Sequence, residues 1–414
     1  MEPAATSETR LLRFARYALL VTFGGLPLYV VRWHYGPLPT TLLETLIIIT
    51  VGVYTIGRLR DGWRRPIATP YDIPIGFLLL AGVISIVVVK DHRTALGLYR
   101  AYFVEPVAIY YVAADLMRQR EYIQRAWIAL AIGTSIFSLL NIEAFVKVAA
   151  AHQLQVGSAP SAIYGDPNYV AMYLEPPVAV AAGILLFGPT RRWRLLGAGW
   201  TAVAGLALLL TFSKGTYLAI VVAAAITVIT VASWRLRIGI GAVFVAAAVV
   251  FTRVPAVAQR LAGTNQSIHD RFQIYSAAYD ALRLHPVFGL GLGGYTFKLN
   301  RVSPEVYPHD IWLTFWIELG ILGAVAFGVI FFGLLWRGWR RWAKVEGFER
   351  AALWGVLVAL VLWFMHGLVD TPYWKNDMSV EFWVLAAVEV AIIAQLRTTP
   401  ASTWAPRPGA PLHV

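Results

Sequence analysis

The sequence contains no cysteine, which excludes disulfide bridges and thiol chemistry. Charged residues are also scarce, because Asp, Glu, Lys and Arg make up 14% of the 414 residues, against about 25% in an average soluble domain. The sequence has no Asp-x-Asp, HExxH, Walker or GxSxG motif. We therefore expect neither a metal site nor a cofactor.

Apolar residues are abundant: 58% of the chain is hydrophobic and the mean hydropathy is +0.62. Apolar runs of roughly 18 or more residues recur along the whole chain, each long enough to cross a bilayer. A closed barrel would instead show short alternating segments. The sequence therefore predicts an all-α integral membrane protein of about twelve transmembrane helices, at 12–31, 38–57, 72–89, 95–116, 123–146, 169–187, 194–212, 214–232, 236–251, 309–335, 351–369 and 378–396.

The net charge of +12 is uneven along the chain. Basic residues gather before the first helix, at 58–65, 118–125, 191–194, 235–237 and 337–350, and after the last helix, all on one predicted side. The positive-inside rule places that side, and both termini, in the cytoplasm. The basic balance is thus a topology signal, and we expect membrane lipids rather than nucleic acid as partners.

The long segment 252–308 separates helices 9 and 10 on the outer face. Its stretch "RFQIYSAAYDALRLHP" has apolar residues, including Tyr275, at helical spacing. The following GxGxxG match at Gly289, Gly291 and Gly294 is interpreted as a tight turn, because no strand–turn–helix unit surrounds it. The predicted divisions are helices 1–9 in 1–251, a loop with an amphipathic helix in 252–308, helices 10–12 in 309–396, and a disordered cytoplasmic tail in 397–414.

Three cations could bind an anion on the outer face. Lys214 stands between two helices with almost no loop, either as a snorkelling lysine or as a fixed cation for a phosphate. Arg271 opens the amphipathic helix, either solvated or bidentate on a phosphate. Arg100 lies within a membrane helix, where a charge faces a cavity or a partner. The i,i+5 spacing of Arg100 and Glu105 argues against a mutual pair.

Four polar residues mark the outer ends of two further helices. Asp166 and Asn168, in "IYGDPNYVAMYL", suit either a substrate site or an ordinary helix cap. His366 and Asp370, in "MHGLVDTP", are four residues apart and share a helix face. A satisfied buried histidine is the alternative interpretation of His366.

His309 stands beside Asp310 at the start of the apolar segment "YPHDIWLTFWIELGILG". The positive end of the helix dipole disfavours an imidazolium there, whereas Asp310 favours it. A neutral histidine suits a general base, and an interfacial histidine without chemistry is the alternative.

These motifs, in their order from 163 to 372, resemble the O-antigen ligase and polymerase family of bacterial inner membranes. The resemblance implies a GT-C-like, metal-independent and inverting glycosyltransferase. Its donor would be a glycan on undecaprenyl diphosphate, and its acceptor a sugar hydroxyl of lipid A-core on the periplasmic side. The resemblance implies that His309 activates the acceptor and that Arg271 binds the donor diphosphate. Lys214 falls where the family commonly has arginine, and many members have asparagine in place of Asp310.

Two alternatives keep the fold but change the acceptor, namely an O-antigen polymerase and a protein O-oligosaccharyltransferase, which fold and motifs do not separate. A transporter of lipid-linked glycans is the third alternative. The absence of an inverted repeat and the gathering of charges at one face argue against it.

Overall fold

The fold is known from a computed structural model of the chain, which describes residues 10–36, 38–61, 67–154, 159–230, 233–253, 264–296 and 305–398. The N-terminal half comprises α1 (Arg10–Gly24), the 3-10 helix η1 (Leu26–Val30), β1 (Arg32–Tyr35), β2 (Leu38–Thr41), α2 (Leu42–Arg60), α3 (Asp72–Val88), α4 (His92–Tyr99), the π-helical turn η2 (Arg100–Val104), α5 (Glu105–Leu116) and α6 (Arg120–Ala150). The rest comprises α7 (Pro167–Phe187), α8 (Arg191–Leu209), α9 (Lys214–Thr230), α10 (Trp234–Arg253), α12 (Thr264–Leu284), α13 (Ile311–Trp342), α14 (Gly347–Gly367) and α15 (Asn376–Thr398).

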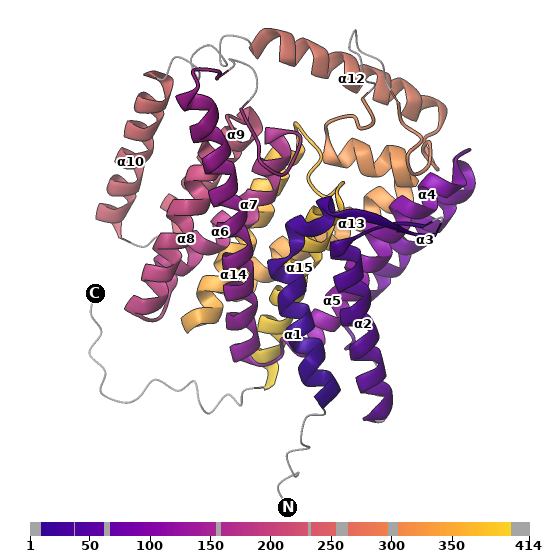
Figure 1. The fold of residues 1–414 in the computed structure, drawn as a ribbon, viewed down its shortest axis with the longest axis horizontal. Helices are drawn as coiled ribbons and strands as arrows, with labels where there is room; N and C mark the ends of the chain where they lie inside the picture. Colours follow the sequence, from indigo (N-terminus) through magenta and orange to yellow (C-terminus); the bar gives the residue numbers. More distant parts are fainter. Residues whose placement is uncertain are drawn as a thin grey trace, which may run out of the picture.

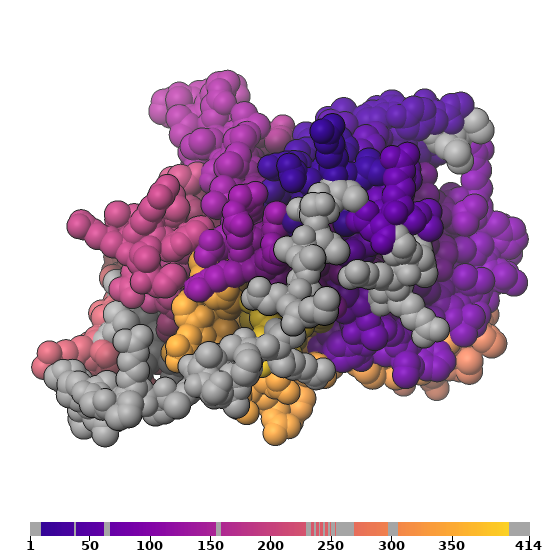
Figure 2. All heavy atoms as spheres, turned by 90° about the horizontal axis from the view of Figure 1, so that it is seen from below, coloured from indigo at the N-terminus to yellow at the C-terminus, as the bar shows by residue number. Residues whose placement is uncertain are grey.

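Most helices run in roughly the same direction, and α12 lies across one end of the bundle (Figure 1). α1 begins and α15 ends at the opposite end, which Figure 2 shows from below. The start of α6 also lies there, because Arg16 of α1 donates a hydrogen bond to Tyr122 at 2.7 Å. The described chain therefore begins and ends on one side of the bundle, and α12 covers the other side.

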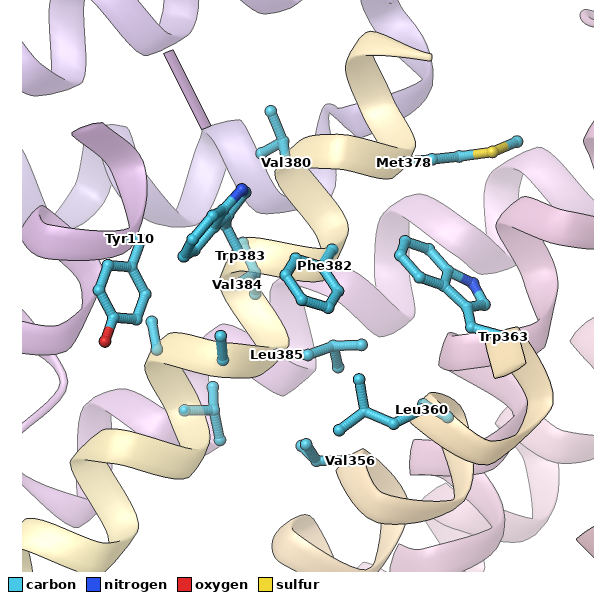
Figure 3. Packing of buried hydrophobic residues seen from close by; sticks show 14 of the residues in the cluster. Tyr110, Val356, Leu360, Trp363, Met378, Val380, Phe382, Trp383, Val384 and Leu385 are labelled. Atoms are coloured by element: carbon cyan, nitrogen blue, oxygen red, sulfur yellow. The ribbon is translucent and has the colours of Figure 1, made fainter. Parts of the chain in front are cut away.

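The core is centred on α15, which packs against α5 and α14. Figure 3 shows Trp383 of α15 facing Tyr110 of α5, while Phe382 faces Trp363 of α14. The ring centroids are 5.1 Å apart in the first pair and 5.9 Å apart in the second. α15 is therefore apolar around most of its circumference because protein surrounds it.

Six helices of the described chain are long and apolar enough to cross a membrane, namely α2, α6, α7, α13, α14 and α15. α3 and α9 contain shorter apolar helices. A helical membrane protein is therefore supported, while the count of twelve spans stays a prediction. Residues 399–414, most of the predicted tail, and residues 254–263 and 297–304 of the outer loop lie outside the described chain.

Two predicted spans begin or end with other structure. The first helix ends at Gly24 and η1 follows, where Pro27 restricts the backbone. The second predicted span starts in β2, which pairs with β1 in a small antiparallel ribbon. Thr41 then caps α2 through a capping box with Glu44. The all-α class is confirmed, and the short hairpin is an addition that hydropathy alone does not distinguish from a helix end.

The segment predicted as one span at 309–335 is kinked at Gly320, whose φ is +70°. The turn after α12 docks into this kink, because Ile321 donates a backbone hydrogen bond to Val287 at 3.0 Å and Leu290 donates one to Ile317 at 2.7 Å. The side chain of Glu318 accepts a hydrogen bond from the backbone N–H of Gly293. The glycine-rich stretch is therefore a structural turn, as its sequence predicts, and it fixes the part of α13 before Gly320.

Candidate functional site

His309 lies between two carboxylates beneath α12. Its Nδ1 is 3.1 Å from Oδ1 of Asp370, and its Nε2 is 3.0 Å from Oε2 of Glu305. Asp370 follows the end of α14 and is almost fully buried, with 4% of its side chain exposed. The structure therefore brings together the predicted residues His309 and Asp370, which are distant in sequence, and adds Glu305.

The charge of His309 follows from these two contacts. Burial lowers the pKa of His309, but the hydrogen bonds to Asp370 and Glu305 raise it, and the pKa reaches about 9. Burial would raise the pKa of Asp370, whereas its contacts with His309 hold that pKa below its usual range. These contacts therefore favour the imidazolium over the neutral imidazole. The sequence set the helix dipole against Asp310, and the structure adds Glu305 and Asp370, which contact the two ring nitrogens directly.

Arg271 of α12 approaches the same pair. Its Nη2 is 4.0 Å from Oδ2 of Asp370, at the outer limit of an ion pair. Its Nη1 is buried and has no hydrogen-bond partner among the described residues. A buried guanidinium N–H without a partner costs free energy of folding. Nη1 is therefore suited to donate a hydrogen bond to an anionic oxygen.

Tyr275, one helical turn after Arg271, holds the backbone of the site. Its hydroxyl lies 3.1 Å from the carbonyl oxygens of both His309 and Leu368, to which it can donate. His309 has a φ of +52°, a conformation that is uncommon for residues other than glycine. Such strain persists where surrounding contacts impose it and is frequent at functional sites. Tyr275 supplies one of these contacts.

Asp310 has a local role. Its side chain accepts a hydrogen bond from the backbone N–H of Leu313 at 2.8 Å and caps α13. Burial raises the pKa of Asp310. The geometry therefore makes Asp310 a helix cap.

His366 is buried and forms its hydrogen bond with a different carboxylate from those that contact His309. Its Nδ1 is 2.7 Å from Oε1 of Glu175, and the hydroxyl of Thr216 donates to the same oxygen at 2.9 Å. The ring of His366 packs closely against Gly215, because a Cβ on Gly215 would lie only 2.6 Å from Nε2 of His366. This packing fixes the start of α9, whose first residue is Lys214. The geometry matches the interpretation of His366 as a satisfied buried histidine, which here supports the backbone beside Lys214.

Arg100 is held by two carboxylates instead of facing an open cavity. Its Nη2 donates to Glu44 at 2.8 Å, and its Nε is 3.3 Å from Oε1 of Glu105. Arg100 and Glu105 therefore form a mutual pair, contrary to the expectation from their i,i+5 spacing. Arg100–Val104 form a π-helical turn, whose i→i+5 hydrogen bonds bring residues five apart closer to one face than an α-helix does.

Asp166 caps α7 by accepting a hydrogen bond from the backbone N–H of Asn168 at 2.8 Å. This is the ordinary capping role that the sequence left open. The neighbouring Tyr169 places its ring 3.4 Å from Nζ of Lys375, which also donates to the hydroxyl of Tyr29 at 3.4 Å. Burial lowers the pKa of Lys375. No carboxylate lies within 4 Å of this ammonium in the described part of the chain.

Sequence reasoning therefore missed Glu305 and Lys375 as site residues. Glu305 lies in the predicted loop 252–308 outside any motif, and Lys375 lies between the last two predicted helices. The fact that Lys375 lies three residues after the predicted "MHGLVDTP" motif is the signal that could have found it. The assembled site offers His309, which can exchange a proton. It also offers the guanidinium of Arg271 and the ammonium of Lys375, which suit an anionic group.

Comparisons with known proteins agree with the sequence motifs. A protein-family model described as O-antigen ligase matches residues 198–328. The match includes Lys214, Arg271 and His309, but ends before α14. No curated protein matches the chain.

Proposed function

We propose that the chain is an O-antigen ligase. The family match over residues 198–328 supports the assignment to the O-antigen ligase family. The family implies a glycosyltransferase-like membrane enzyme that uses lipid-linked glycans and lipid A-core in general. We extend this to transfer of a glycan from undecaprenyl diphosphate to a sugar hydroxyl of lipid A-core. The protein would lie in the inner membrane with both termini cytoplasmic and His309 on the periplasmic face.

One observation carries this proposal, namely the grouping of a buried, unpaired guanidinium N–H of Arg271 with the His309–Asp370 pair. A group that takes up a proton and a group that attracts an anion are the two requirements for displacing a diphosphate from a sugar. Fixed donors that await developing charge are effective because they need no reorganisation during the reaction.

The reaction proceeds as one displacement at the anomeric carbon. The acceptor oxygen forms a bond to that carbon from the face opposite the diphosphate, and the carbon–oxygen bond to the diphosphate breaks. The leaving diphosphate takes the bonding electron pair, and the acceptor proton passes to Nε2 of His309. Asp370 stays on Nδ1 and stabilises the resulting imidazolium. Inversion of the anomeric centre follows from this geometry.

Nε2 must be free and unprotonated before it can accept that proton. Oε2 of Glu305 lies 3.0 Å from Nε2. We propose that the acceptor hydroxyl replaces Glu305, which removes one of the two contacts that raise the pKa of His309. Arg271 and Lys214 then face the diphosphate, and Lys375 supplies a further cation near the acceptor side. Arg100 is left out, because Glu44 and Glu105 largely neutralise it.

The first test is transfer by the purified protein, with undecaprenyl-diphosphate glycan and lipid A-core and with excess chelator. We expect wild-type product, and at least a hundredfold loss in His309→Ala, since general base catalysis contributes about 10²–10⁴-fold. His269→Ala is the matched control, because His269 is exposed on α12. Wild-type activity in His309→Ala would remove this residue from the mechanism.

The second test compares Arg271→Ala with Arg283→Ala, an exposed arginine of the same helix. We expect only Arg271→Ala to weaken use of the donor, with a raised donor KM and a lowered kcat, because a bidentate contact to the leaving group strengthens as charge develops. If both variants behaved alike, the diphosphate would have to bind elsewhere.

The products distinguish the alternatives. Lengthened lipid-linked chains without modified lipid A-core would identify a polymerase, and glycosylated protein would identify a protein O-oligosaccharyltransferase. Movement of intact lipid-linked glycan across proteoliposomes without transfer would identify a transporter. Each of these results would contradict the ligase proposal while leaving the membrane fold intact.

A further inference from the structure

A second candidate site lies at the far end of α13 from His309. The part of α13 beyond Gly320 rises roughly 30 Å, at about 1.5 Å per residue, which matches the hydrocarbon thickness of a bilayer. α14 begins near the start of α6, because Arg120 forms an ion pair with Glu349 at 2.9 Å. The end of α13 therefore lies on the side of the bundle where α1 begins, opposite α12.

A cavity of about 510 Å³ opens there and is lined by four basic side chains and two aromatic rings, those of Arg337, Arg340, Arg341, Lys344, Tyr71 and Trp336. None of the four cations forms an ion pair within 4 Å in the described ranges. The guanidinium of Arg337 lies 5.9 Å from the ring centre of Tyr71, and that of Arg340 lies 5.3 Å from the ring centre of Trp336. The cavity is therefore strongly cationic.

One buried acid lies behind this cavity. A Cβ on Gly338 would be 3.2 Å from a carboxylate oxygen of Glu389, which is fully buried in α15. Glu389 can offset at most one charge, that of the adjacent Arg337. Arg340, Arg341 and Lys344 remain to attract an anion.

An apolar groove of about 470 Å³ adjoins the basic cavity, between α9, α13 and α14. Trp336 lines both spaces, and the groove continues along Phe332, Leu335 and Leu357. Trp336 and Trp339 are exposed by 63% and 52%. Exposed tryptophans at a helix end mark the level of the lipid head groups. A charged cavity at that level and an apolar groove below it match the two parts of a phospholipid.

We propose that this end of α13 binds an anionic phospholipid, with its phosphate in the basic cavity and an acyl chain in the apolar groove. Basic pockets between membrane helices are suited to anionic head groups. The positive-inside rule explains the sign of the charges, but not their gathering around a cavity beside a hydrophobic groove. The site lies in the leaflet opposite His309 and does not depend on the proposed transfer reaction.

The test measures lipid binding to the full-length protein in detergent, by native mass spectrometry and by thermal shift. The probes are phosphatidylglycerol and phosphatidylcholine with the same acyl chains, inorganic phosphate and undecaprenyl diphosphate. We expect phosphatidylglycerol to bind about tenfold or more tightly than phosphatidylcholine, from the attraction of several basic residues. Inorganic phosphate alone should bind more weakly, since it leaves the groove empty.

The variants isolate the cavity. The double variant Arg340→Gln/Arg341→Gln should abolish the preference for phosphatidylglycerol. The double variant Arg340→Lys/Arg341→Lys should keep most of this preference, which would show that the fold tolerates substitution at these positions. Arg191→Gln/Arg192→Gln is the matched control, because it removes the same charge from exposed positions at the start of α8.

Three results would overturn the proposal. The first is an equal loss in the control, which would indicate unspecific surface charge. The second is full saturation by inorganic phosphate, which would indicate a site for a soluble anion. The third is displacement of phosphatidylglycerol by undecaprenyl diphosphate at equal concentration, which would assign the groove to a polyprenyl chain.

Discussion

Replacement of Glu305 by glutamine tests how His309 acquires its charge. The two imidazole nitrogens contact Asp370 at 3.1 Å and Glu305 at 3.0 Å, and these contacts raise the pKa of His309 to about 9. Glu305→Gln keeps the size of the side chain but removes one negative charge. The pKa of His309 must therefore fall.

The size of the change follows from the strength of that contact. A hydrogen bond to a charged group contributes about 1.5–3 kcal/mol, and each pKa unit corresponds to about 1.4 kcal/mol. The imidazole is 27% exposed and the Glu305 side chain 18%, so solvent screening reduces the effect. We expect the pKa of His309 to fall by about one unit.

The assay is the pH dependence of kcat/KM at limiting acceptor, which reports the ionisation of the free enzyme. If neutral His309 accepts the proton, activity rises with pH through about 9 in the wild type, and this acid limb moves to lower pH in Glu305→Gln. Activity near pH 7 then increases several-fold. Glu143→Gln is the control, because Glu143 is exposed and contacts Lys147.

An alkaline limb near pH 9 that moves to lower pH in the variant would refute this reasoning. Imidazolium would then be the working form, and His309 would act as an acid or as a cation for the diphosphate. A profile unchanged by Glu305→Gln would show that Glu305 does not contact His309 in the working enzyme.

Three further predictions concern the fold and the cations. Gly320→Ala should destabilise the protein by about 2 kcal/mol or more, because a Cβ there would lie 2.3 Å from the carbonyl oxygen of Val287 at a φ of +70°. Gly328→Ala in the same helix has open space and should leave thermal unfolding in detergent nearly unchanged, so equal losses would contradict the role of the kink. Arg100→Gln should lower the free energy of unfolding by about 1 kcal/mol, because it leaves Glu105 unpaired; solvent screening at the partly exposed Arg100 keeps this value small. A raised donor KM in this variant would instead place Arg100 in the donor site. Transfer should persist in excess chelator, and a strict requirement for divalent ions would overturn the metal-independent reaction.

The sequence by itself determined the class of the protein and its local features. Long apolar runs require helices in a membrane, because backbone polar groups must pair within each segment. Capping is equally local, and Asp166 and Asp310 stand at helix starts where their side chains accept nearby backbone N–H groups. The glycine-rich stretch was also identified as a turn, since glycine readily adopts positive φ.

Only the tertiary structure decided which of the polar residues meet. Asp370 lies 61 positions from His309, and no periodicity links residues on different helices. The π-helical turn that pairs Arg100 with Glu105 leaves no mark in a hydropathy profile, because it changes the helix period and not the composition. The charge of His309 depends on the sum of burial and two carboxylates. These contributions to the pKa arise from packing. The sequence therefore identified the histidine, whereas the tertiary structure determined the contacts that shift its pKa.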